Sequence, residues 1–189
     1  MVDAIAAEEK AKYQKMWGCE SYRERSPGMR HLTDALARLK PMPGASVVDL
    51  GCGTGRVSAA LQGMGFNVTA VDIAHNACSE FDGRFVASCL WELPVDLGRF
   101  EYGFCADVLE HVPTDRIPLT LQKISEHVEL VYFQIANFVC HEGDKIGEHL
   151  HLTVKPLAWW AEELQQYFNV IEAVANPKHH VFVCKSLAF

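Results

Sequence analysis

The 189-residue sequence lacks any long hydrophobic run. No apolar stretch approaches the ~20 residues that a membrane-spanning helix needs. The first twelve residues, MVDAIAAEEKAK, also lack the basic start and apolar core of a secretory signal. We therefore expect a cytoplasmic protein with no membrane partner. Hydrophobic residues make up 49% of the chain, which suits a single globular domain over residues 1–189, with residues 1–28 as an N-terminal helical extension.

Paired cysteines and runs of basic residues are missing as well. The seven cysteines are scattered without a CxxC pair, which indicates buried thiols in a reducing compartment rather than a disulfide framework. The formal net charge is −7, from 17 basic and 24 acidic residues. Because long nucleic acids bind to basic surfaces, this balance argues against DNA as a partner, although it leaves room for a local basic patch.

What the sequence does contain is a strand followed by a glycine-rich turn, VVDLGCGTGR, at residues 47–56. The apolar strand carries Asp49, and Gly51, Gly53 and Gly55 follow at every second position. Glycine reaches positive φ freely and has no Cβ, so such a turn lets the backbone approach a ligand closely. The helix expected next would direct its free N–H groups at the turn and favour an anionic group. The stretch thus predicts a ligand-binding loop.

A carboxylate at the end of the next strand points to a ribose. Residues 67–73, NVTAVDI, form the expected strand, and Asp72 lies near its end, where an acid accepts hydrogen bonds from ribose hydroxyls in nucleotide-binding units. The dinucleotide fingerprint is absent, because Arg56 stands three residues after Gly53, and no Lys–Ser/Thr pair follows as in a phosphate-binding P-loop.

These residues resemble the class I S-adenosylmethionine (SAM) dependent methyltransferases, whose first motif is similar to hhDhGCGTG and whose second strand ends in an acid. The resemblance covers residues ~29–189 and implies SAM as the cofactor. It implies that the glycine loop and Asp49 surround the methionyl part and that Asp72 holds the ribose. The alternative is that residues 47–56 form only a glycine-rich turn that binds no ligand. The presence of Asp72 at the end of the next strand argues against this alternative.

One position departs from the family pattern. The family places an acid just after the third strand, expected within residues 83–90, to accept the adenine amino group. Here Ser88 or Cys89 occupies that place, followed by Leu90 and Trp91, which we expect on the adenine side. Backbone groups or Glu92 could substitute for the missing carboxylate, and a buried core role is the alternative for Trp91.

A second motif, DVLEHV, follows the fourth expected strand and resembles that of the ubiquinone-biosynthesis-type small-molecule methyltransferases. In a doubly wound sheet, residues at this strand end face the ligand crevice. We expect Asp107 in the cofactor site and His111 as the catalytic base, with Glu110 orienting it or binding the acceptor. The alternative is that Glu110 and His111 only cap or brace the next helix.

A metal site is the alternative use of the same residues. Asp107, Glu110 and His111 offer two carboxylates and an imidazole, and a histidine from the loop 138–152 could complete an oxygen and nitrogen site. Ubiquinone-type and small-RNA 2′-O-methyltransferases have a similar ExxEH followed by His. Our main expectation assigns no metal.

Two segments are expected to form the acceptor site. The N-terminal segment would present Tyr13, Trp17, Tyr22 and Arg23, since in many class I methyltransferases it covers the pocket; core packing is an equal alternative for the first two. The irregular loop 138–152 is too long for a plain connection and carries His149 and His151, which we also expect near the acceptor.

The predicted fold is α/β: a Rossmann-like, doubly wound, mostly parallel seven-stranded sheet with a C-terminal antiparallel hairpin at residues 168–176 and 179–186, preceded by an N-terminal helical segment. The motifs of DNA base methyltransferases are absent. The predicted function is methyl transfer from SAM to O or N of a small-molecule acceptor. The alternatives are a metal-assisted RNA 2′-O or nucleotide methyltransferase, and a non-catalytic SAM-binding sensor or partner protein.

Overall fold

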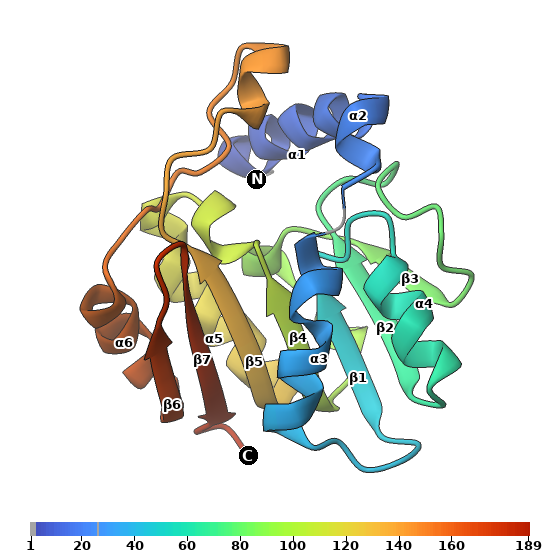
Figure 1. Cartoon of the computed structure of the whole chain (residues 1–189), viewed down its shortest axis with the longest axis vertical. Coiled ribbons are helices and arrows are strands. Elements are labelled where there is room, and N and C mark those ends of the chain that lie inside the picture. Colours follow the sequence, from blue (N-terminus) through green and yellow to red (C-terminus); the bar gives the residue numbers. More distant parts are fainter. Residues whose placement is uncertain (1–2, 26) are drawn as a thin grey trace.

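The computed structural model describes residues 3–25 and 27–189. A central sheet has helices on both faces, and two further helices lie across one end of it (Figure 1). The strands are β1 (Ser46–Leu50), β2 (Asn67–Asp72), β3 (Arg84–Ala87), β4 (Phe100–Ala106), β5 (Val128–Ala136), β6 (Phe168–Ala175) and β7 (His179–Ser186). The α-helices are α1 (Ala4–Trp17), α2 (Glu20–Arg23), α3 (Pro27–Leu39), α4 (Arg56–Gly63), α5 (Ile117–His127) and α6 (Leu157–Gln165).

The strand order is β3-β2-β1-β4-β5-β7-β6. The first five strands of that order pair in parallel, and β7 pairs antiparallel with both β5 and β6. This confirms the predicted seven-stranded sheet with its C-terminal antiparallel hairpin. The chain reverses its direction of winding between β1 and β4, and ligands of open α/β sheets bind at the carboxyl ends of the strands there.

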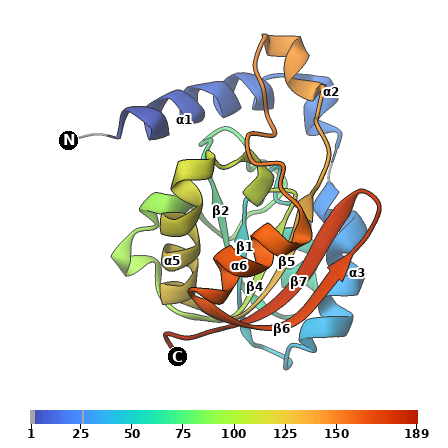
Figure 2. The ribbon, with the colours of Figure 1, turned by 90° about the vertical axis from the view of Figure 1, so that its left-hand side faces the viewer.

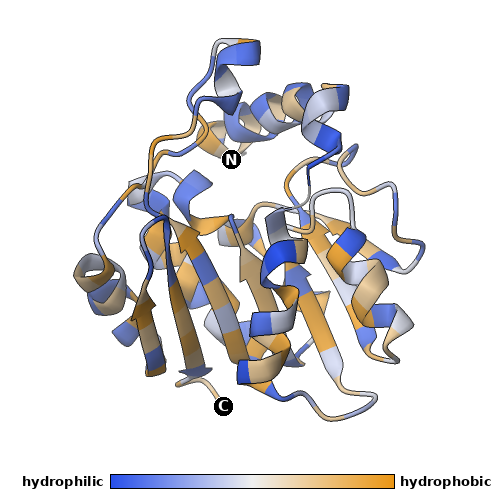
Figure 3. Cartoon of the chain, viewed as in Figure 1, coloured by the Kyte–Doolittle hydropathy of each residue, from blue (hydrophilic) through white to orange (hydrophobic). Residues whose placement is uncertain are grey.

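The two faces of the sheet are buried by different helices. Along β1, Val47 packs in one apolar cluster with α3 and α4, and Val48 packs in the other with α5 and α6. Because side chains of a strand alternate between faces, a strand covered on both sides must be apolar throughout. Figure 3 shows largely hydrophobic strands and helices in which hydrophilic and hydrophobic residues are mixed.

The helices α1 and α2 lie above the carboxyl ends of the strands, beside the loop 138–152 (Figures 1 and 2). Asp3 caps α1 by accepting a hydrogen bond from the Ile5 N–H at 3.0 Å. Tyr13 and Met16 then pack against residues of the sheet end and the loop, forming a small third cluster. We call α1 and α2 the lid.

The single-turn helix α2 lies between α1 and α3; residue 26 and residues 1–2 lie outside the described part of the chain. Among the described residues, no helix combines the length and apolar character that a membrane crossing demands.

Candidate active site

The glycine loop turns sharply at the end of β1. Gly51, Gly53 and Gly55 have φ values of 78°, 54° and 88°, in the left-handed region that glycine adopts without strain. A Cβ on Gly51 would lie 2.3 Å from Val108 Cγ2, and a Cβ on Gly53 would lie 2.9 Å from Trp17 Cη2. The loop backbone therefore touches both the segment after β4 and the lid, leaving no room for side chains.

The two aspartates predicted for the cofactor are both buried at strand ends. Asp49 is 2% exposed, and its Oδ2 accepts a hydrogen bond from Ser58 Oγ at 2.6 Å. Asp72 accepts from the Gly53 N–H at 3.0 Å and from the Ala74 N–H at 2.9 Å, and so ties the glycine loop to β2. Burial raises the pKa of Asp49 to about 7 and that of Asp72 to about 6.

Two cavities open at this end of the sheet. The first, of about 100 Å³, lies beside Asp72 and the segment Ser88 to Trp91, which includes Leu90. The second, of about 370 Å³, extends from Asp49 and the glycine loop to Phe104 and the loop 138–142. The residues that line both cavities are Trp17, Tyr22, Gly51, Asp107 and His111. The cavities thus meet at the lid, the glycine loop and the end of β4.

Asp107 and Glu110 follow β4, and Asp107 has an unusual backbone conformation. Asp107 has a φ of 55°, uncommon for a residue with a side chain, and its Oδ1 accepts a hydrogen bond from Gln134 Nε2 at 3.2 Å. Glu110 is fully buried; its Oε1 accepts from the Ala136 N–H at 3.1 Å. Burial, aided by Asp107, raises the pKa of Glu110 well above its usual range. The Glu110 carboxyl therefore braces the end of β5.

His111 connects the lid to the loop 138–152. Its Nδ1 lies 2.7 Å from the Tyr13 hydroxyl and 3.1 Å from the Leu150 carbonyl oxygen. A proton on Nδ1 can be donated to that carbonyl, which leaves the Nε2 lone pair free. Burial, with His151 as a further cause, lowers the pKa of His111 to about 3. The imidazole is therefore neutral at physiological pH.

Glu110, His111 and His151 form a cluster of the kind that holds a metal ion. Their ligand atoms all lie within 4.8 Å of one another, and Asp107 is outside this group. The Nδ1 of His151 lies 2.7 Å from the Phe138 carbonyl oxygen, so both imidazoles face a backbone carbonyl on one side, as metal-ligating histidines do. Among the described residues, the buried Glu110 Oε2 has no hydrogen-bond partner. These residues fit a divalent ion.

Two predicted acceptor residues do not line either cavity. The Arg23 guanidinium donates to the carbonyl oxygens of Trp17, Asn76 and Ala77 and to Ser79 Oγ, so it anchors the lid to the segment after β2. The exposed His149 offers its backbone carbonyl to Lys12. By contrast, Tyr13 lines the first cavity and His151 the second.

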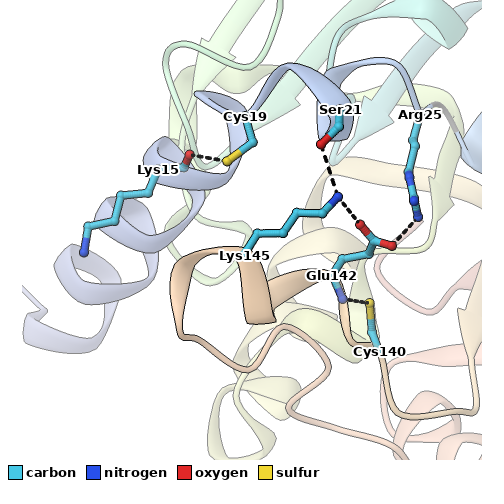
Figure 4. A network of polar contacts seen from close by, with 7 residues as sticks. All are labelled: Lys15, Cys19, Ser21, Arg25, Cys140, Glu142 and Lys145. Atoms are coloured by element: carbon cyan, nitrogen blue, oxygen red, sulfur yellow. Dashed lines mark hydrogen bonds and ion pairs between the residues drawn. The ribbon is translucent and has the colours of Figure 1, made fainter.

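A clasp of side chains joins the lid to the loop 138–152 (Figure 4). Glu142 forms ion pairs with Arg25 and with Lys145, and Lys145 also donates to Ser21 Oγ at 3.2 Å. Sequence reasoning missed this clasp, because no local pattern links segments more than a hundred residues apart. It also missed Glu9, which lines the first cavity. A signal existed there, since Glu9 and Tyr13 are four residues apart on one helical face.

The sequence model of a methyltransferase-domain family matches residues 21–183. The chain belongs to this family. Its members use SAM as the methyl donor, so the expectation of a class I methyltransferase with that cofactor is confirmed at the level of the family.

Relatives with curated names are ubiquinone biosynthesis O-methyltransferases. The protein from Xanthomonas campestris is 33% identical over an alignment of 90 positions that covers 42% of this chain and 38% of the relative. The Xylella fastidiosa protein is 37% identical over an alignment of 90 positions that covers 42% of this chain and 37% of the relative. The chain therefore aligns with well under half the length of these relatives.

Solved structures share the fold. The 1,6-didemethyltoxoflavin-N1-methyltransferase of Burkholderia thailandensis superposes with a TM-score of 0.71 at 21% identity, covering 96% of this chain and 87% of that one. The magnesium protoporphyrin IX methyltransferase of Synechocystis PCC 6803 gives a TM-score of 0.70 at 17% identity, covering 94% and 97%.

Proposed function

We propose that this protein transfers a methyl group from SAM to an oxygen or nitrogen atom of a small-molecule acceptor. The observation that carries the proposal is the meeting of the two cavities at Gly51, Asp107 and His111. SAM would span that junction, with its nucleoside in the first cavity and its methionyl part beside Asp49 and the glycine loop in the second, and an acceptor in the rest of the second cavity would meet the methyl group there. SAM supplies a methyl on a sulfonium, already activated for displacement, so the protein has mainly to align the acceptor and exclude water.

On the donor side, the residues fit SAM. Asp49 with Gly51, Gly53 and Gly55 would surround its methionyl part, where the loop leaves no space for a Cβ at Gly51. Asp72 has lone pairs left for ribose hydroxyls after accepting two backbone bonds. Leu90 and Trp91 would contact the adenine, and the buried Trp91 Nε1 has no hydrogen-bond partner among the described residues. Asp107 would close the site from the β4 side.

On the acceptor side, lid and loop supply the contacts. Tyr13, Trp17, Tyr22 and His151 would enclose the acceptor with aromatic surface. An acceptor hydroxyl becomes strongly acidic as its oxygen takes the methyl group, so His111 would take up that proton on its free Nε2 despite its lowered pKa, with Nδ1 held by Leu150. Glu110 would act as a positioning residue, because its backbone carbonyl accepts from Leu152 and Thr153 and fixes the chain that carries His151.

A second candidate is a metal-assisted methyltransferase for an RNA 2′-hydroxyl or a nucleotide. The cluster of Glu110, His111 and His151 favours it. A divalent ion held there would polarise an acceptor hydroxyl and assist its deprotonation. The same three residues would then serve as ligands.

The two candidates and the non-catalytic sensor predict different destinations for the methyl group. Purified protein is incubated with labelled SAM and a cell extract, with and without chelator, and the extract is then split into small-molecule, RNA and protein fractions. Label in the small-molecule fraction is expected. Chelator-sensitive label in RNA would favour the second candidate. Tight SAM binding without label in any fraction of several extracts would contradict transfer and leave a sensor.

We also propose a cytoplasmic location and no DNA partner. All seven cysteines, each within the described residues, are free thiols, which suits a reducing compartment.

A further inference from the structure

The position that should bind the adenine amino group holds no carboxylate. Ser88 directs its hydroxyl at the carbonyl oxygens of Cys89 and Glu92, at 3.1 and 3.0 Å. The Cys89 thiol is a weak hydrogen-bonding group. Glu92 is exposed and does not line the first cavity. An adenine in that cavity therefore finds no carboxylate acceptor for its amino group on the strand side.

We propose that Glu9, on the lid helix α1, supplies this carboxylate. Ala6, Glu9 and Tyr13 follow one another at positions i, i+3 and i+7, so they share one face of α1. Glu9 and Tyr13 line the first cavity together with Ser88 to Trp91, which places this face of α1 opposite the segment after β3.

The surroundings of Glu9 hold its carboxylate ready for a donor. The Glu9 side chain is only 14% exposed, and Lys12 Nζ, on a side chain 7% exposed, lies 2.6 Å from its Oε2. Lys12 is itself fixed by the His149 carbonyl oxygen at 3.2 Å. A buried carboxylate is costly without a partner, and the pairing with Lys12 offsets part of that cost while leaving Oε1 free of ion pairs; burial still raises the pKa of Glu9 on balance. An acid on an otherwise apolar lid face is thereby stabilised.

The other carboxylates of the first cavity are committed elsewhere. Asp72 accepts hydrogen bonds from the Gly53 and Ala74 N–H groups and is assigned to the ribose. Asp107 accepts one from Gln134 at the junction with the second cavity. Glu9 is the remaining acid that lines this cavity within the described chain. The inference rests on the proposed function, because it takes the first cavity as the site of the SAM nucleoside.

The test is a thermodynamic cycle that combines one protein change with one ligand change. Calorimetry measures the affinity of the full-length protein for S-adenosylhomocysteine and for its analogue whose purine lacks the 6-amino group. Wild type is expected to prefer the amino-bearing ligand by about tenfold to a hundredfold, as for a hydrogen bond to a charged acceptor. Glu9→Ala is expected to bind both ligands about equally, because the acceptor is gone.

Glu8→Ala is the matched control, since Glu8 is the neighbouring acid on α1 and is exposed. It should keep the wild-type preference. Glu9→Gln, which preserves size and one neutral acceptor, should retain a preference of only about threefold and serves if the alanine variant misfolds.

An equal loss of affinity for both ligands in Glu9→Ala would show that Glu9 only supports the lid and would overturn the inference. Wild type that ignores the amino group would overturn it too. Failure of wild type to bind S-adenosylhomocysteine at all would instead overturn the proposed function, so the two failures are distinguishable.

Discussion

The two halves of the candidate site are built by different means. The glycine-loop half consists of backbone groups and two aspartates that are 2% and 6% exposed, all at the ends of β1 and β2. The lid half consists of side chains from α1, α2 and the loop 138–152, joined through partly exposed groups such as Arg25, whose side chain is 53% exposed. The first half is fixed by the sheet, whereas the second depends on contacts between segments outside it.

The contrast teaches where specificity is located. A binding loop made of backbone groups at a strand end suits a ligand that many enzymes share, because substitutions of surface side chains leave the backbone groups of the loop in place. Loops and outlying helices carry variable contacts on a rigid scaffold, and they suit the acceptor. In this protein the lid reaches over both cavities, so it would contribute to both ligands.

The largest effect is expected where the two halves meet. His111→Ala should lower turnover by roughly 100-fold to 10,000-fold, the range for loss of a general base, while affinity for S-adenosylhomocysteine stays close to wild type. Steady-state kinetics and calorimetry measure the two quantities. His141→Ala is the control, because that imidazole also lines the second cavity but is 81% exposed. Wild-type turnover in His111→Ala would remove it from the mechanism.

An alanine in the glycine loop should destabilise the half of the site that is fixed by the sheet. Gly51→Ala places a Cβ 2.3 Å from Val108 Cγ2 at a φ of 78°, so strain and overpacking should lower the free energy of unfolding by roughly 2–5 kcal/mol. Gly63→Ala is the matched control, since nothing lies within 4 Å of its Cβ, and in helix α4 it should stabilise by up to about 1 kcal/mol. Urea unfolding distinguishes them, and equal stability of both variants would contradict the tight loop.

The buried Asp49 should make this half sensitive to pH. Its pKa of about 7 in the folded protein is above the unfolded value, so its contribution to stability is complete below about pH 4 and is lost as the pH rises through 7. The difference in unfolding free energy between wild type and Asp49→Asn should fall by an amount on the order of 4 kcal/mol over that range. Urea unfolding at stepped pH measures it; a pH-independent difference would mean that Asp49 ionises normally.

Asp72 should contribute to ligand affinity. Asp72→Ala is expected to weaken S-adenosylhomocysteine binding by about 1.5–3 kcal/mol for each hydrogen bond lost, since each involves a charged acceptor. The loss of the Gly53 anchor adds to the effect. Calorimetry that gives an unchanged affinity would dismiss the ribose assignment.

The smallest effect on stability is expected at the clasp. Glu142→Gln removes ion pairs to Arg25 and Lys145, and exposed pairs contribute less than about 1 kcal/mol each. The variant should nevertheless speed hydrogen exchange in α2, because the lid loses a tether. Glu129→Gln, which breaks an exposed pair with Lys185 at the other end of the sheet, should leave α2 unchanged. Identical exchange in both variants would show that the clasp does not hold the lid.

The fold was largely predictable from local patterns. The break between residues 176 and 179 indicated the final hairpin, which β6 and β7 form. The glycine loop was predictable for the same reason, since strand, turn and helix are adjacent in the sequence. Family resemblance added the fourth strand's DVLEHV to the site.

The lid half was less predictable because its contacts join distant segments. Lys12 meets the His149 carbonyl across 137 positions, and Arg25 meets Glu142 across 117. The residues around His149 and His151 in the sequence do not indicate that His151 lines a cavity and His149 does not. This difference depends on the path of the whole loop, which returns to hydrogen-bond the Glu110 carbonyl. The sequence alone allows Arg23 to contact a ligand as readily as Tyr22. In the structure, however, the Arg23 guanidinium donates hydrogen bonds to backbone carbonyl oxygens.

The position of α1 has a consequence for where this protein can be cut. The family match begins at residue 21, after α1 has ended at Trp17. A fragment trimmed to that boundary would keep all seven strands but would lose the Tyr13 hydroxyl beside His111 and the indole over Gly53. The residues matched by the family model and the residues that line the two cavities therefore begin at different points of the chain. Truncations should therefore stop before α1, since Glu9, Tyr13 and Trp17 of that helix line the cavities.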